Sequence, residues 1–256
     1  MHTRNILLST ALTTLGCLSL STAADAFSLG GHMTSDGYRS DGTAWEADHD
    51  YNALFPDGNS TDDTAFVAES RYGDAGGAAQ YEFKIFDHQD GGGLDEANFN
   101  WGNGTSYDFS LEYTESSWTY SLFEFGTENL LTSVTEAFTA PFSDIFIRTR
   151  ANNGTSAVVD NLFLDGVAVG DRSAVENVEG DFGVDYLRIS DVSEPFTLTG
   201  TSTMSWTEGS NTKGSRLAYQ IKVVNLEDTQ PVPEPTILVG LGISLLGLTR
   251  LRRTRF

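Results

Sequence analysis

Cysteine is almost missing from this sequence. Cys17 is the only one, and it lies in an apolar segment near the N-terminus. The rest of the chain can therefore form no internal disulfide, which excludes the small disulfide-stapled domains common among secreted proteins. Roughly 200 residues remain between the two terminal segments, enough to bury a core of their own without such cross-links.

Cations are scarce as well, with 15 Lys and Arg against 36 Asp and Glu. Residues 27–235 keep 35 acidic and 10 basic side chains, a net charge of about −25. Such a surface repels nucleic acid, so we expect no nucleic-acid partner. The charge provides solubility and low self-association. Alternatively, some acidic loops bind Ca²⁺, which prefers carboxylate and carbonyl ligands.

Catalytic motifs are missing too. There is no G-x-S-x-G sequence, and neither a His-x₃-His pair nor a Cys pair suggests zinc. Glycoside hydrolysis needs two carboxylates at a set separation, and among so many acids some pair meets that condition by chance. We therefore predict no catalytic residue and no enzyme, with a polysaccharide hydrolase as the less favoured alternative.

Helical periodicity is nearly absent from residues 27–224, and short alternating runs take its place. In 106–114, Tyr107, Phe109, Leu111 and Tyr113 share one face, and 118–125 returns after a turn as an antiparallel hairpin. Asn153-Gly154 and Asp165-Gly166 are further hairpin turns. The predicted strands are 43–51, 64–69, 79–87, 106–114, 118–125, 129–135, 144–150, 156–164, 167–169, 186–190, 195–207 and 215–224.

These strands predict an all-β fold, and an antiparallel two-sheet β-sandwich of jelly-roll type fits them best. A single closed barrel is the alternative. The polar stretch 171–182 is the one place where we expect a short helix. Trp118 and Trp206 lie on inward faces and are expected in the core. Trp101, near a turn, is the candidate for stacking against a sugar ring.

Metal-binding motifs are incomplete. The loop from Asp57 begins like an EF-hand, but Asp62 stands where the needed glycine would be. The remaining concentration of hard oxygen ligands is at Asp87, Asp90 and Asp95. These three residues are the candidate Ca²⁺ site, and solvated turn acids are the alternative interpretation.

The C-terminus carries the one long apolar run outside the N-terminal segment. Val232-Pro233-Glu234-Pro235 precedes the uncharged segment 236–249, and Arg250, Arg252, Arg253 and Arg255 follow it. As a helix the segment spans about 21 Å, which is short against a hydrocarbon core of about 30 Å. We predict a short membrane helix with its arginines in the cytoplasm, and a buried core helix is the alternative.

The N-terminus has the pattern of a removable signal peptide. A short basic start is followed by an apolar stretch, and Ala24-Asp25-Ala26 fits an A-x-A cleavage site. Cleavage after Ala26 would make Phe27 the first residue of the mature protein. A permanent N-terminal anchor is the alternative.

The Pro-Glu-Pro motif, the apolar helix and the terminal arginines together resemble the PEP-CTERM sorting signal of Gram-negative bacteria. That resemblance covers 232–256. It implies a tail that anchors the protein transiently in the inner membrane and is processed by an exosortase-type protease. The mature protein would pass to the cell surface or to an extracellular matrix rich in exopolysaccharide.

The segments 144–150, 158–162, 185–189 and 196–206 resemble the exported modules called choice-of-anchor domains, most closely the W subtype. That resemblance covers about 30–224 and implies a surface-exposed β-domain without an assigned catalytic residue. The expected organisation is a signal peptide (1–26), an acidic β-sandwich (27–224), a linker (225–231) and a sorting signal (232–256). We expect a non-enzymatic structural or interaction role, and the alternative is a Ca²⁺-dependent carbohydrate-binding module for exopolysaccharide.

Overall fold

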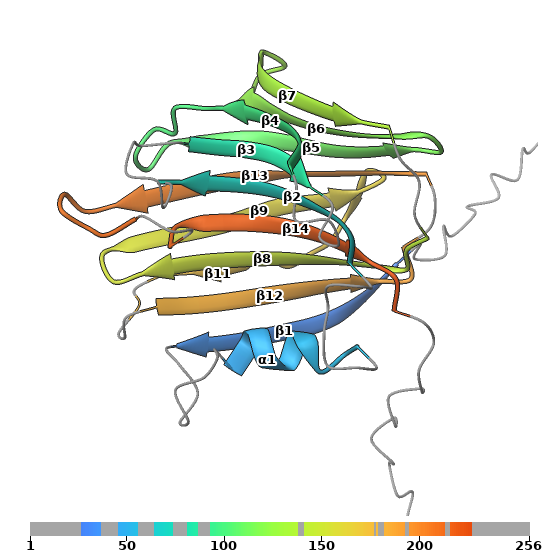
Figure 1. Ribbon diagram of the computed structural model, residues 1–256, viewed down its shortest axis with the longest axis horizontal. Coiled ribbons are helices and arrows are strands. Elements are labelled where there is room, and N and C mark those ends of the chain that lie inside the picture. Colours follow the sequence, from blue (N-terminus) through green and yellow to red (C-terminus); the bar gives the residue numbers. More distant parts are fainter. Residues whose placement is uncertain are drawn as a thin grey trace, which may run out of the picture.

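The computed structural model is an all-β sandwich of two antiparallel sheets, which confirms the predicted fold class (Figure 1). It describes residues 27–36, 46–55, 64–73, 81–86, 93–137, 141–176, 178, 182–192, 195–212 and 216–226. Each sheet has seven strands, and every strand pair is antiparallel.

Sheet 1 contains both the first and the last of the described strands. Its order is β1 (Ser28–Asp36), β12 (Phe182–Ser190), β8 (Asp144–Asn152), β14 (Ala218–Val224), β2 (Thr64–Tyr72), β3 (Tyr81–Phe86) and β4 (Gly93–Asn98). Sheet 2 has the order β10 (Val167–Ala168), β9 (Thr155–Leu164), β13 (Phe196–Trp206), β5 (Ser106–Thr114), β6 (Ser117–Glu124) and β7 (Leu130–Glu136), and β11 (Ser173–Val175) pairs with β9.

The core lies between the sheets and is filled by the residues that strand alternation points inward. In β5 the buried positions are the four aromatic and aliphatic side chains predicted for that face. Aromatic rings meet across the interface: Phe66 stacks on Trp118 at 4.4 Å and Phe83 on Tyr120 at 4.2 Å. The hydroxyl of Tyr120 donates to that of Tyr219 at 2.8 Å, which satisfies two polar groups in an apolar surrounding.

Two local predictions are wrong. Residues 43–51 were expected as a strand, but Glu46–Asn52 forms α1. The helix buries Ala47, Tyr51 and the following Phe55 against the outer face of sheet 1, at a spacing of four residues. A helix was expected in 171–182, yet the residues described there (171–176, 178 and 182) contain strand β11 and the start of β12, and none is helical.

The two ends of the domain emerge at the same end of the sandwich (Figure 1). Ser28 pairs with Ser190 at one end of β12. At that same end, the amide of Ser143 donates to the carbonyl of Val224 at 2.9 Å, and the amide of Val192 donates to the carbonyl of Ser143 at 2.9 Å. The predicted signal peptide (1–26) and sorting signal (232–256) lie outside the described residues. Among the residues that the structure describes, no helix is long and apolar enough to cross a bilayer.

Candidate functional site

Strand β9 of sheet 2 contains a β-bulge that changes which side chains face outward. In the β9–β13 ladder Asp160 pairs with Thr201 and Phe163 with Thr199, so Asn161 and Leu162 both oppose Gly200. Asn161 has a positive φ of 49°, which few residues other than glycine adopt. The extra residue reverses the alternation of β9, so that Leu162 is buried and Phe163 points outward with 42% of its surface exposed.

Gly200 is what makes the bulge fit. A Cβ at this position would lie 2.8 Å from both Leu162 Cδ2 and Phe109 Cζ. Real Cβ atoms do not approach other heavy atoms so closely, so any larger residue would have to displace one of these core side chains. The bulge therefore depends on a glycine in the neighbouring strand.

An open groove of about 450 Å³ lies beside the outward ring. Phe163 of β9 forms one side of the groove and Phe123 of β6 forms the other. Strands β13 and β5 lie between them, so at ordinary strand spacing the two side chains are about 14 Å apart. Asp108, Ser110, Thr199 and Thr201 lie between them, but most of the surface that the groove exposes is apolar. The lining is Asp108, Phe109, Ser110, Phe123, Thr127, Glu128, Asn161, Phe163, Thr199, Gly200 and Thr201.

Hydrogen bonds hold the groove floor in place. Asp108 accepts from the Thr201 hydroxyl at 2.9 Å through Oδ1 and from the Gly126 amide at 2.7 Å through Oδ2. The second bond ties the β6–β7 turn, which supplies Thr127 and Glu128 to the groove, to strand β5. The floor and one wall of the groove are therefore preorganised.

Sheet 2 and its turns carry most of the exposed large apolar side chains of the described residues. Of the large apolar residues exposed in the described chain, all but Leu29 come from strands of sheet 2 or their turns: Phe125 (56%), Leu130 (58%), Leu131 (44%), Phe163 (42%) and Val167 (39%). Phe163 also lines a second hollow of about 470 Å³ on the β10 side, together with Ala168, Gly170 and Asp171. Exposed apolar surface with polar surroundings is typical of a binding site.

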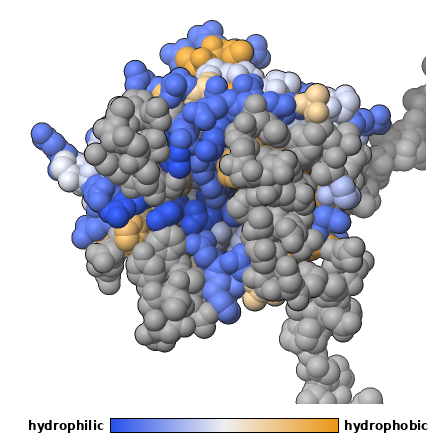
Figure 2. All heavy atoms as spheres, in the orientation of Figure 1, coloured by the Kyte–Doolittle hydropathy of each residue, from blue (hydrophilic) through white to orange (hydrophobic). Residues whose placement is uncertain are grey.

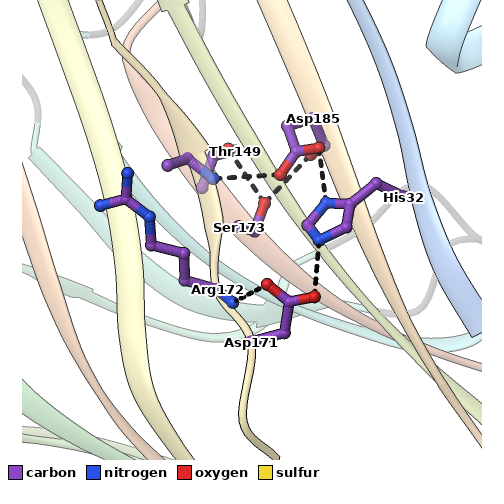
Figure 3. A network of polar contacts seen from close by, with 7 residues as sticks. His32, Thr149, Asp171, Arg172, Ser173 and Asp185 are labelled. Atoms are coloured by element: carbon purple, nitrogen blue, oxygen red, sulfur yellow. Dashed lines mark hydrogen bonds and ion pairs between the residues drawn. The ribbon is translucent and has the colours of Figure 1, made fainter. Parts of the chain in front are cut away.

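A second cluster links sheet 1 to β11 (Figure 3). His32 Nδ1 lies 2.9 Å from Asp185 Oδ1, and its Nε2 lies 3.2 Å from Asp171 Oδ2. Burial disfavours the charged imidazole, but hydrogen bonds and charge attraction from Asp185 and Asp171 outweigh it and raise the pKa of His32. Asp185 also accepts from the Ala174 amide at 3.0 Å.

This histidine is not arranged for nucleophilic catalysis. Each ring nitrogen faces a carboxylate, so neither is left to accept a proton from a hydroxyl. The nearby Ser173 is fully buried and bonds instead to Thr149 at 3.0 Å and to the Asp185 carbonyl at 3.2 Å. The cluster is a clamp that ties β1 and β12 to β11.

A third cluster covers the outer face of sheet 1, where hydrophilic residues gather along the middle of the view in Figure 2. Apart from Arg172, the described basic side chains lie here: Arg71, Lys84, Arg148, Arg150, Arg188, Arg216 and Lys222. Glu82 bonds Arg71 and Lys84, while Asp144 bonds Arg188 at 2.7 Å. Arg71, Lys84, Arg148 and Arg188 are therefore neutralised by acids of the same network, while Arg150 and Arg216 lie over the Phe182 ring.

Asp48 of α1 is the centre of that network. It receives two hydrogen bonds from Arg148, at 3.0 and 3.1 Å, and one from the Tyr186 hydroxyl at 2.7 Å. Burial alone would raise its pKa, but Arg148, the Tyr186 hydroxyl and Lys222 outweigh burial and lower the pKa of Asp48. Lys222 lies 4.6 Å from the centre of the Tyr51 ring. Burial, and then repulsion from Arg148, lower the pKa of Lys222 to about 7.

None of the site residues predicted from the sequence lines the groove beside Phe163 in the part of the chain that the structure describes. Trp101 is only 6% exposed and packs edge-on against Phe99 at 4.9 Å and Tyr107 at 5.5 Å. Its ring belongs to the core between the sheets, and the turn that follows it is fixed to β13 by the Gly104 amide, which donates to the Met204 carbonyl at 2.9 Å. The placement of Trp101 therefore corrects the expectation that it stacks on a sugar.

The predicted Ca²⁺ ligands are only partly described. Asp87 and Asp90 lie outside the described residues. Asp95 accepts from its neighbour Glu96 through Oδ1 and from the Thr135 amide of β7 through Oδ2, both at 3.0 Å. In the part of the chain that the structure describes, no three His, Cys, Asp or Glu side chains are grouped to hold a metal ion.

The sorting motif Val232–Pro235, the anchoring Arg250, Arg252, Arg253 and Arg255, and the cleavage residues Ala24 and Ala26 also lie outside the described residues. Phe163 and Gly200, by contrast, were not predicted as site residues. Phe163 is exposed only because of the register of β9 against Gly200 in β13. That register cannot be read from the residues of either strand alone.

Comparison with models of known protein families finds no match for the chain, and comparison with curated proteins finds no significantly similar sequence.

Proposed function

We propose that the chain is an exported, non-enzymatic protein of the cell surface or extracellular matrix of a Gram-negative bacterium. Residues 236–249 hold it at the inner membrane until an exosortase-type protease cuts near the Pro233–Pro235 motif. The observation that carries the proposal is that β1 begins and β14 ends at the same end of the sandwich. A tail attached there can tether and release the domain without disturbing either sheet.

The start of the domain supports the same account. Phe27, the first residue after the expected cleavage site, is 9% exposed and belongs to the core between the sheets. The fold therefore uses the chain from this residue onward, as a mature N-terminus at Phe27 requires.

Within this proposal we assign the sandwich to the jelly-roll type. From β8 onward the chain passes repeatedly between the sheets, with β8, β12 and β14 in sheet 1 and β9 and β13 in sheet 2. Such crossing connections distinguish a jelly roll from two sheets built from separate hairpins.

Carbohydrate binding is the second candidate function, and the groove beside Phe163 favours it. The Ca²⁺-dependent form rests on Asp87, Asp90 and Asp95, and each carboxylate oxygen of Asp95 already accepts one backbone amide. A metal that binds only the folded state should raise the melting temperature with its concentration. An unchanged melt at millimolar Ca²⁺ would remove the metal from the proposal.

The sorting account is tested by intact-mass measurement of the protein recovered from a Gram-negative host that has an exosortase-type protease. The expected mass is that of a chain that begins at Phe27 and lacks residues 236–256. Glu234→Ala should block processing and keep the full tail in the membrane fraction, while Thr229→Ala, in the linker, should be processed normally. Wild-type protein that retains residues 236–256 would leave only a plain membrane anchor.

A further inference from the structure

We propose that the groove on the outer face of sheet 2 binds an uncharged glycan chain, with Phe163 as the ring on which a sugar stacks. The inference builds on the proposed function because it names the class of partner for an exported domain that acts by binding. The site comprises Phe163 and Phe123 at its two sides, and Thr199, Thr201, Ser110 and Asp108 on its floor.

The bulge is the first argument for a ligand. Strict alternation through β9 would place Phe163 on the inward face with Ala157 and Val159, both of which are buried. The observed register instead exposes the ring and holds Asn161 at a positive φ. The register buries Leu162 in place of Phe163, so the exposed phenyl ring contributes less to stability than a buried one would. Bulges that redirect a side chain occur preferentially at functional sites.

The chemistry of the lining identifies the occupant as a glycan. A sugar offers an apolar ring face together with many hydroxyl groups, and the groove offers two phenyl rings beside a floor of Ser and Thr hydroxyls. Thr201 donates its proton to Asp108, which leaves the lone pairs of its hydroxyl to accept from a ligand. A small number of fixed polar groups within an apolar surround is typical of small-molecule and sugar sites.

Charge decides that the glycan is uncharged. Among the described residues of the lining, Asp108 and Glu128 carry carboxylates and none carries a basic side chain. Arg172 lines the adjoining hollow, but it is paired with Glu176 at 2.9 Å. An anionic polysaccharide would face like charge at Asp108 and Glu128, and so would a second copy of this acidic chain docked face to face.

The length of the site suits a chain rather than a single sugar. Phe163 and Phe123 are separated by two intervening strands, about 14 Å apart at ordinary strand spacing. The hollow on the β10 side continues past Phe163. A chain that crosses the strands would therefore lie over Phe163 and end against Phe123.

The test is affinity electrophoresis of the full chain, purified in mild detergent, in gels that contain dextran, laminarin or galactomannan, with polygalacturonate as the anionic comparison. At least one neutral glycan should retard the wild type, and polygalacturonate should not. Phe163→Ala should weaken that binding about tenfold or more, as expected for an aromatic anchor. Phe163→Tyr should retain it, because the ring face remains.

Leu29→Ala is the matched control, since Leu29 is 46% exposed on sheet 1. It should bind as the wild type does. Phe163→Ala should still unfold in one cooperative transition, with a Tm only modestly below that of the wild type, because 42% of the residue is exposed. Retardation by none of the neutral glycans, equal retardation of Phe163→Ala, or equal binding of polygalacturonate would overturn the proposal, as would a Phe163-dependent dimer in sedimentation.

These outcomes are independent of tail processing. Protein that binds a neutral glycan yet retains residues 236–256 refutes the sorting account alone. Protein that is processed normally yet binds no glycan refutes the groove alone.

Discussion

Replacing Asp48 with alanine should be among the most destabilising single changes on the surface of sheet 1. Asp48 receives both hydrogen bonds of a bidentate pair from Arg148 and a third from Tyr186. It is the polar attachment of α1 to the sheet, next to the apolar contact made by Tyr51, which stacks on Tyr186 at 4.7 Å.

The magnitude follows from what the substitution leaves behind. Arg148 is 8% exposed, and without Asp48 its guanidinium would remain buried beside Lys222, another cation. Removing one partner of a buried ion pair costs about 3–5 kcal/mol. For a domain of this size each kcal/mol lowers Tm by about 2–4 °C, so Tm should fall by roughly 6–20 °C.

The assay is thermal unfolding at neutral pH followed by circular dichroism, arranged as a double-mutant cycle. Asp48→Ala with Arg148→Met should be more stable than Asp48→Ala alone, because the buried guanidinium is removed together with its partner. Asp50→Ala is the control: Asp50 is exposed on the same helix, and its loss should change the free energy of unfolding by no more than about 0.5 kcal/mol.

A Tm of Asp48→Ala within a degree or two of the wild-type value would refute the expected loss of stability. That result would mean that Arg148 is hydrated without its partner and that α1 does not shield it from water. If the double variant were as unstable as Asp48→Ala, the loss would come from helix packing rather than from an unpaired charge.

Three further changes test other parts of the fold. Burial and Arg148 lower the pKa of Lys222 to about 7, so the charged form of this side chain opposes folding. Lys222→Met should therefore raise the free energy of unfolding by about 2–4 kcal/mol at pH 7. In melts at increasing pH this gain should shrink toward about pH 10, where the lysine is neutral in both states. Because the pKa of His32 is raised in the folded state, the protonated imidazole stabilises the fold. This contribution to the free energy of unfolding is full below about pH 6.5 and is lost as pH rises through the folded-state pKa. His32→Gln should accordingly lower Tm at about pH 5.5 and leave it unchanged at about pH 9. Gly200→Ala places a Cβ 2.8 Å from two core side chains and should lower the urea midpoint by an amount equivalent to about 1–3 kcal/mol.

Much of the fold could be predicted because its signals are local. The 106–114 run alternates cleanly, and β5 occupies the same residues. Asp165-Gly166 has positive φ at both positions, 51° and 77°, as the predicted two-residue hairpin turn requires. In both cases neighbouring residues alone decide the structure.

Helix α1 was missed because its stability is not local. Seven residues are too few for a helical pattern to emerge, and helices of that length do not persist alone in water. What stabilises it is the outer face of sheet 1, where Phe146 and Tyr186 meet Tyr51. These residues lie about a hundred positions away in the sequence, so a strand was the reasonable prediction for 43–51.

The candidate site was missed for a related reason. If the alternation of Ala157 and Val159 continued along β9, Phe163 would face the core. It faces outward instead because Asn161 and Leu162 share Gly200 as their single partner. A one-residue slip exchanges the two faces of a strand, and only the ladder with β13 fixes that slip. A core with room for Leu162 does not by itself require an exposed ring, because a polar residue in place of Phe163 would satisfy the same register without exposing an apolar surface. The phenyl group is therefore the part of this arrangement that folding does not explain, and binding gives it a physical reason.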